Sequence, residues 1–179
     1  MAEWITAIGT IGTFVVIAAS AIAALLQLRH MRSGNQIAAY NECRETMDAP
    51  DFRTALGLIR SDLTERLREP GVADEIIRQS LPGEYASIRH VANLFESMGL
   101  FVRIGMMDRK IACELWSGIV LDVWNRLRPL TAAARRNGGD GIWINFEYMA
   151  ALASQYIDST EGEKYPEGVP RMPLDTVSD

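Results

Sequence analysis

The sequence predicts an all-α protein in which a single N-terminal transmembrane helix is followed by a cytosolic helical bundle. Three observations favour this fold class. Residues 4–28 form an unbroken run of 25 uncharged residues. Beyond this run, apolar residues recur at spacings of three and four, as they do on one face of a helix. No window of useful length alternates apolar and polar residues, so the pattern predicts no sheet. The 179 residues are enough for one domain with a buried core.

The uncharged run is long enough to cross a membrane as a helix. At about 1.5 Å per residue it would extend about 37 Å, whereas the hydrocarbon core of a bilayer is about 30 Å thick. Arg29, His30 and Arg32 follow the run, and only Glu3 precedes it. This charge bias predicts that the three basic residues lie at the cytoplasmic surface of a bacterial inner membrane, with the C-terminal domain in the cytoplasm. A cleaved signal peptide and a buried core helix are the alternatives.

Small and hydroxylated residues follow one face of this predicted span. Such residues let membrane helices approach closely and form hydrogen bonds with one another. The face therefore predicts either an interface between copies of the chain or the lining of a pore, and a helix that only anchors the domain is the third interpretation. The residues that form this face, which we call the small-residue stripe, are Thr6, Gly9, Thr10, Thr13, Ile17, Ser20 and Gln27.

The rest of the chain divides into a bundle and a tail. We expect residues 1–30 to form the transmembrane helix, residues 31–157 the bundle and residues 158–179 a flexible acidic tail. The tail has six acids, two bases and three prolines, a composition typical of disorder. Within the bundle, glycine, proline and asparagine turns predict helices over 32–47, 52–68, 72–79, 82–104, from Asp108 to a bend or break at Pro129, and 142–157.

Apolar stripes on two of these helices predict the core. One stripe on the helix after Pro82 consists of Tyr85, Ile88, Ala92, Phe95 and Val102. The stripe on the helix that Asp108 caps consists of Ile111, Leu115, Ile119 and Val123. Beside the first stripe a polar row recurs at intervals of four, three and seven: Arg89, Asn93, Glu96 and Arg103. This row predicts either a polar network with another helix, in which Asn93 and Glu96 are partly buried, or an ordinary solvated face.

The composition offers little for catalysis or metal binding. The two histidines, His30 and His90, have no cysteine or carboxylate at ligand spacing, so we expect no metal and no cofactor. Cys43 and Cys113 do not form a disulfide framework and fit a reducing compartment. The net charge of −5 gives no general attraction for nucleic acid. A local basic cluster of Arg126, Arg128, Arg135 and Arg136 could contact RNA, phospholipid or the acidic tail, or could be a solvated helix end.

The run "ANLFESMGLFVRIGMMDRKIACELWSGIVLDVWNRLRPLTAAARR", followed by "FEYMA", resembles the bacterial family known as domain of unknown function 4760. Members of that family pair a short N-terminal membrane helix with a helical cytosolic domain, and the family has no settled reaction. The features that carry the resemblance are Phe95-Glu96, the turn from Gly105 to Asp108, Trp124, Pro129, Arg135 and Phe146-Glu147.

The architecture is also similar to that of the small membrane accessory protein of type VI-B CRISPR systems, whose helical domain is a divergent HEPN fold. That resemblance implies a membrane pore and a role in antiphage defence. HEPN ribonucleases use an arginine a few residues before a histidine for acid–base cleavage. Neither His30 nor His90 has an arginine five to seven positions before it, which disfavours a ribonuclease of this type.

Three functional hypotheses follow from the sequence. The first is a non-enzymatic, oligomeric inner-membrane effector that forms a pore and serves antiphage defence. The second is a membrane-tethered module whose bundle or tail recruits a cytosolic partner. The third is a degenerate HEPN-type ribonuclease that uses Arg89, His90 and Glu96. The predicted partners are the membrane, further copies of the chain and a cytosolic protein, with nucleic acid disfavoured.

Overall fold

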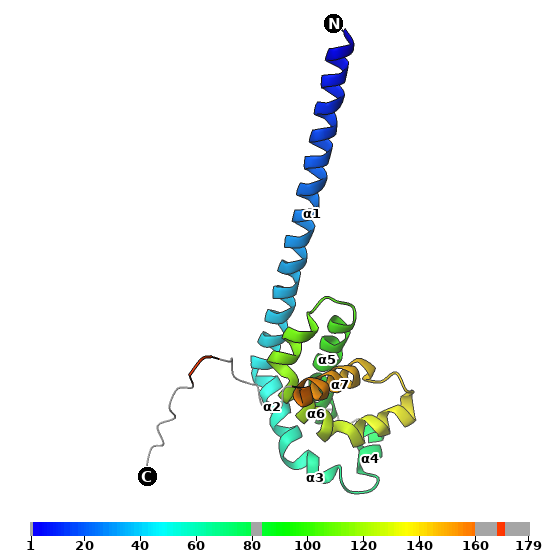
Figure 1. Cartoon of the computed structure of the whole chain (residues 1–179). Coiled ribbons are helices and arrows are strands. Elements are labelled where there is room, and N and C mark those ends of the chain that lie inside the picture. Colours follow the sequence, from blue (N-terminus) through cyan, green and yellow to red (C-terminus); the bar gives the residue numbers. More distant parts are fainter. Residues whose placement is uncertain (1, 80–83, 160–167, 171–179) are drawn as a thin grey trace.

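The computed structural model describes residues 2–79, 84–159 and 168–170 (Figure 1). The side chains that it describes begin at residue 12 and leave out those of 28–30, 32, 33, 35, 79 and 84. Every regular element in the described ranges is a helix, which confirms the all-α class. In chain order the elements are α1 (Ala2–Asp48), α2 (Pro50–Leu58), the π-helix η1 (Ile59–Leu63), α3 (Thr64–Arg66), α4 (Val72–Gln79), α5 (Glu84–Arg103), α6 (Arg109–Gly138) and α7 (Ile144–Ser159).

The helix α1 has 47 residues and extends far beyond the bundle, which gathers around its C-terminal end (Figure 1). The prediction that the first helix continues past the uncharged run to Met47 is confirmed. In the part of the chain that the structure describes, no helix has a stretch that is both long and apolar enough to cross a membrane. The predicted span over 1–30 therefore has no counterpart in the described part of the chain.

The core of the bundle is built around α5. This helix packs against α7 and α2, and α6 packs against α7 and α4. The predicted stripe on α5 is confirmed, because Ile88, Ala92, Phe95 and Val102 are buried and Tyr85 is half-buried. Aromatic rings join the helices: Phe95 stacks on Phe146 with ring centroids 5.2 Å apart. Such contacts supply the apolar burial that stabilises helices too short or too polar to persist alone.

The predicted face of α6 is largely wrong. Ile111 and Leu115 are 48% and 57% exposed, Ile119 is only half-buried, and of the predicted stripe only Val123 is buried. The face that packs on the bundle carries Ala112, Cys113, Trp116, Val120, Leu127 and Leu130 instead. Both faces of this helix are apolar, and the larger continuous one, which includes Trp116, enters the core because it removes more apolar area from water.

Pro129 neither breaks nor ends α6, which runs on to Gly138. Proline removes one backbone hydrogen bond from a helix, but the neighbouring Leu127 and Leu130 are fully buried. Packing on both sides of the proline thus keeps the helix continuous, as tertiary contacts override local propensity. The expected cap at Asp108 is confirmed, since its carboxylate accepts a hydrogen bond from the Ile111 backbone N–H at 3.0 Å.

The boundaries of the remaining elements differ from prediction in two places. The helix expected over 52–68 is interrupted by η1, where Ser61 has φ −93° and ψ −108°, outside the helical range. α7 begins at Ile144 because Trp143 has a positive φ of 53°, which a helix does not contain. Pro82 and most of the predicted acidic tail, residues 160–167 and 171–179, lie outside the described residues.

Candidate functional site

The N-terminal half of α1 presents apolar side chains that no other part of the bundle covers. All described side chains from residue 12 to residue 27 are exposed, and Phe14, Val16, Ile17 and Leu25 are each more than half exposed. A soluble monomer rarely leaves so long an apolar surface open to water. This segment is therefore the surface of the molecule that most clearly requires a binding partner to cover it.

Four residues of the small-residue stripe fall within this uncovered segment. Thr13, Ile17, Ser20 and Gln27 are exposed, and a methyl group added at Gly12 would meet nothing within 4 Å. The side chains of Thr6, Gly9 and Thr10 lie outside the described side chains, as do those of the predicted membrane-surface residues Arg29, His30 and Arg32. Within one copy of the chain, the structure leaves the whole circumference of α1 available between residues 12 and 27.

The base of α1 is joined firmly to the bundle through Tyr40. Its ring lies 5.7 Å from that of Trp116, between centroids. Its hydroxyl accepts a hydrogen bond from the Asp108 backbone N–H at 2.8 Å and donates one to the Asp108 carbonyl at 3.2 Å. Burial, together with the nearby Asp108 carboxylate, raises the pKa of Tyr40 in spite of the backbone hydrogen bond. The hydroxyl thus fixes the start of α6 at a definite height along α1.

The polar row of α5 separates into two parts in the structure. Asn93 and Glu96 reach the residues that lead into α7, so these two do meet another helix. Arg89 instead lies over the Tyr85 ring of its own helix, 5.8 Å from the centroid, and Arg103 is exposed at the end of α5. Asn93 and Glu96 thus bond to the segment before α7 and to its first turn, but only Glu96 is partly buried and Asn93 is exposed. Arg89 and Arg103 belong to solvated surfaces.

Glu96 caps the N-terminus of α7 from a different helix. One carboxylate oxygen, Oε2, accepts hydrogen bonds from the backbone N–H groups of Asn145 and Phe146 at 2.9 and 2.8 Å. The other, Oε1, accepts one from Asn145 Nδ2 at 2.6 Å. These N–H groups belong to the first turn of α7, where a helix has no internal acceptors and favours a negative charge. The Glu96 carboxylate supplies both the missing acceptor and the negative charge.

Two further contacts hold the segment before α7. Trp143 Nε1 donates to Asn93 Oδ1 at 3.1 Å, and Arg135 Nε donates to the Ile142 carbonyl at 2.9 Å. Arg135 also pairs with Glu147 at 2.7 Å. A tryptophan at positive φ is strained, and these bonds over-determine its conformation. We call the set of Asn93, Glu96 and Arg135, with the segment 142–147 that they hold, the α7 clamp.

Gly99 allows α5 to approach this clamp. A Cβ at this position would lie 1.9 Å from the Asn145 carbonyl oxygen and 2.6 Å from its carbon, far inside the distance that atoms tolerate. The two helices meet here by backbone contact, and only glycine permits it. Several features behind the family resemblance, namely Glu96, Arg135 and Phe146-Glu147, thus lie together in a structural device.

The predicted basic cluster is dispersed over three separate contacts. Arg135 serves the α7 clamp, and Arg136 pairs with Asp74 at 2.8 Å. Arg126 Nε pairs with Asp122 Oδ1 at 2.7 Å, and Arg128 is exposed. Three of the four arginines therefore tie α6 to other parts of the bundle or to its own helix, and they do not form one continuous basic surface.

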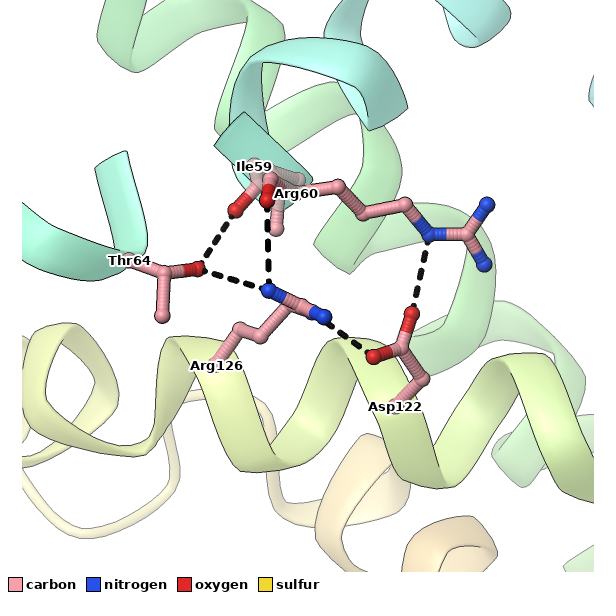
Figure 2. Close-up of polar contacts among 5 residues, drawn as sticks. All are labelled: Ile59, Arg60, Thr64, Asp122 and Arg126. Atoms are coloured by element: carbon pink, nitrogen blue, oxygen red, sulfur yellow. Dashed lines mark hydrogen bonds and ion pairs between the residues drawn. The ribbon is translucent and has the colours of Figure 1, made fainter. Parts of the chain in front are cut away.

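Arg126 stabilises the π-helix next to it, as Figure 2 shows. Its NH1 nitrogen donates to the Arg60 carbonyl at 3.3 Å and to Thr64 Oγ1 at 3.1 Å, while Thr64 Oγ1 donates to the Ile59 carbonyl at 2.7 Å. The distorted backbone thus gains partners for its carbonyl groups. Asp122 also pairs with a second guanidinium, that of Arg60, at 2.9 Å. Burial by itself raises the pKa of Asp122, but the two arginines lower it by more, so the net shift is downward.

The residues proposed for nucleophilic or acid–base chemistry do not converge. Glu96 is engaged in the α7 clamp, whereas His90 is exposed and its ring lies edge-on to Phe52, 6.1 Å between centroids. Cys43 and Cys113 are both buried and free of disulfides, and burial raises the pKa of Cys43 to about 11. Among the described residues no group of three or more His, Cys, Asp or Glu is placed to hold a metal ion.

Comparison with known proteins agrees with the family resemblance. No curated protein and no solved structure matches the chain at a significant level, so the similarity to HEPN proteins stays a prediction. The model of one family, Domain of unknown function (DUF4760), matches residues 14–152. This match begins inside the uncovered segment of α1 and ends within α7, which places both the apolar helix and the α7 clamp inside the family's common region. The chain belongs to the DUF4760 family.

Proposed function

We propose that the protein is an oligomeric membrane protein in which α1 enters a lipid bilayer and the bundle remains on its cytoplasmic side. The observation that carries the proposal is the uncovered apolar surface of α1. Complete burial of one large apolar side chain contributes about 1.5–3 kcal/mol, and seven such side chains between Phe14 and Leu26 are more than half exposed. A bilayer, or a bilayer shared with further copies, supplies the missing cover.

The sequence around this segment supports the same placement. The run without charge extends from residue 4 to residue 28, long enough for a helix that crosses a bilayer. Arg29 and Arg32 follow it, and basic residues next to an apolar helix favour the cytoplasmic surface. We infer that the inner membrane of a bacterium is the location.

The small-residue stripe supports self-association within the bilayer. Small residues let a neighbouring helix approach closely, and such a helix can bond the Ser20 hydroxyl, for which lipid offers no partner. If helices assemble around a pore, Ile17 is the large apolar residue of the stripe and would form the constriction. The defence role is suggested only by the analogy stated above, and a plain tether that recruits a cytosolic partner is the alternative.

Membrane association is tested with two arginine substitutions on the same helix. Ile17 and Ile37 are equally exposed, at 62% and 61%, but they lie about 30 Å apart along α1. Arginine at the centre of a membrane helix costs about 2.5–3.5 kcal/mol. We expect the wild type and Ile37→Arg to stay in the membrane fraction after an alkaline carbonate wash, and Ile17→Arg to be depleted about 100-fold. Recovery of the wild type in the wash would contradict the proposal.

Self-association is tested on the stripe itself. Thr13→Leu places a larger side chain on the stripe and should reduce the oligomer mass measured in mild detergent. Val15→Leu, on another face, should leave that mass unchanged because lipid accepts leucine as readily as valine. A wild type that is monomeric in detergent and in cross-linked membranes would favour the tether, and equal behaviour of both variants would remove the stripe as an interface.

A further inference from the structure

We propose that the turn between α5 and α6 is a second membrane contact, which binds the phosphate groups of anionic phospholipids. The inference rests on the proposed function, since α1 must first hold the bundle beside a bilayer. Four observations carry it: exposed apolar side chains on the turn, a local excess of positive charge, a pocket beside that charge, and the position of the turn relative to α1.

The turn is rigid and presents two apolar side chains to the outside. The backbone N–H groups of Met106 and Met107 both donate to the Phe101 carbonyl, at 2.8 and 3.0 Å, and Gly105 adopts a positive φ of 73°. This geometry buries Met107 but leaves Ile104 61% and Met106 41% exposed. These two exposed side chains lie outside the core of the bundle and together form a small apolar surface that an external partner can cover.

Positive charge surrounds these apolar residues. Arg103, Arg109 and Lys110 are exposed, and Asp108 is the one acid between residues 103 and 110, so this segment carries three positive charges against one negative in a chain whose net charge is −5. The Asp108 carboxylate is engaged by the Ile111 N–H at 3.0 Å. Apolar side chains interleaved with exposed cations are typical of surfaces that contact anionic lipid.

A pocket of about 550 Å³ opens beside the same cations. Its lining residues include two cations, one acid and polar residues of α7: Arg109, Lys110, Asp108, Gln155 and Tyr156. Arg109 NH2 donates to Gln155 Oε1 at 3.2 Å. The pocket lies between the start of α6 and the end of α7. A lipid phosphate could therefore be held by two cations and by polar groups from a second helix, which charge alone on a flat surface would not provide.

The distance of the turn from the uncharged part of α1 can be compared with the thickness of the lipid headgroup layer. Tyr40 fixes Asp108 twelve residues after Leu28, about 18 Å along α1. The turn itself projects from there toward the side to which α1 extends (Figure 1). The lipid headgroups occupy about 5–8 Å beyond the hydrocarbon, and their field extends a further 8–10 Å at physiological salt. The field of the headgroups therefore extends to about the level of Tyr40, and the turn projects from that level toward the headgroups.

Charge also decides between lipid and a second copy of the chain. Two copies that met through this turn would bring positive charges close together, which repel, whereas a phosphate-rich surface neutralises those charges. Each lysine or arginine at such a surface contributes about a fivefold increase in binding. The occupant that we assign is therefore an anionic phospholipid.

The experiment uses the full chain reconstituted in vesicles, with a fluorophore on Met106→Cys. The native cysteines Cys43 and Cys113 are buried, so the introduced thiol reacts selectively. A matched probe on Glu69→Cys reports from the exposed opposite end of the bundle. The vesicles contain phosphatidylcholine alone or with phosphatidylglycerol, and carry a collisional quencher on the headgroups. We expect quenching at Met106→Cys to rise several-fold with phosphatidylglycerol and to remain low at Glu69→Cys.

The charge-reversed variant Arg103→Glu/Arg109→Glu/Lys110→Glu should lose this increase, while Arg68→Glu at the far end should keep it. Equal quenching at the two probes in vesicles that float with the protein would overturn the inference and leave the role of α1 intact. So would equal quenching in both kinds of vesicle. A chain that does not float would overturn both proposals.

Discussion

The α7 clamp and the N-terminal half of α1 differ in the exposure of their apolar side chains. At the α7 clamp, Phe95 and Phe146 are fully buried, and Glu96 and Arg135 bond the backbone groups beside them. Asn145 Oδ1 is buried there without a hydrogen-bond partner. Along α1, from residue 12 to residue 27, every described side chain is exposed. One region is completed by the chain itself, and the other is complete only with a partner. Substitutions in the clamp should therefore change folding, whereas substitutions in the upper part of α1 should change location.

The largest expected effect is on the clamp, from Gly99→Ala. The new Cβ would lie 1.9 Å from the Asn145 carbonyl oxygen, so α5 and α7 must separate. We expect the free energy of unfolding to fall by about 3–5 kcal/mol, measured by denaturant titration in detergent. Gly118→Ala is the matched control on α6, where the added methyl meets nothing within 4 Å. That variant should gain about 0.5–1 kcal/mol; a comparable loss in both variants would refute close helix contact as the cause.

Glu96→Gln tests the tertiary cap with a smaller change. The amide retains one acceptor oxygen but places an NH2 group against N–H donors, so part of the cap is lost. Hydrogen bonds to a charged group contribute about 1.5–3 kcal/mol, and because Glu96 is only partly buried we expect a destabilisation at the lower end of that range. Glu65→Gln removes an exposed charge that pairs with Arg68 at 2.9 Å and should cost less than about 0.5 kcal/mol. Equal losses would show that general charge balance, rather than capping, explains the effect.

The Asp122 cluster predicts a moderate dependence of stability on pH. Burial opposes ionisation, but the arginines outweigh it and lower the pKa of Asp122 below its ordinary value of 3.8. The folded state thus binds this proton less readily than the unfolded state, so the contribution is complete above that value and is lost as the pH falls through the lowered pKa. We expect Asp122→Asn to flatten the acid limb of the stability–pH curve, measured by denaturant titration at a series of pH values. An unchanged acid limb would show that the carboxylate contributes nothing.

The smallest expected effect on folding comes from Ile17→Arg. Residue 17 contacts no part of the bundle, so the unfolding of the bundle should keep its free energy within about 0.5 kcal/mol of the wild type. The probe is the fluorescence of the tryptophans in the bundle. A large destabilisation would mean that α1 and the bundle fold as one unit, and the contrast between the two regions would disappear.

Local signals predicted much of the fold. Periodicity located α5 and its buried face, and Asp108 identified the start of α6 through ordinary cap chemistry. The continuation of α1 to Asp48 followed because a single glycine, Gly34, is the only breaker before Pro50. These features depend on residues close together in the sequence, which is why the sequence reveals them.

The interhelical contacts could not be predicted in the same way. Glu96 and Asn145 are 49 positions apart, and no local pattern distinguishes a carboxylate that caps another helix from one on a solvated face. The exposed stripe of Ile111 and Leu115 misled because α6 has two apolar faces, and only packing decides between them. The role of Gly99 likewise depends on where the Asn145 backbone lies.

The central claim is that the bundle is complete alone and the apolar part of α1 is not. Hydrogen–deuterium exchange of the full chain, with and without vesicles, tests this directly because it reports each segment separately. We predict that amides of α5 and α7 are equally protected in both conditions, whereas amides of residues 12–27 gain strong protection only with vesicles. Equal exchange of residues 12–27 with and without lipid would contradict the account.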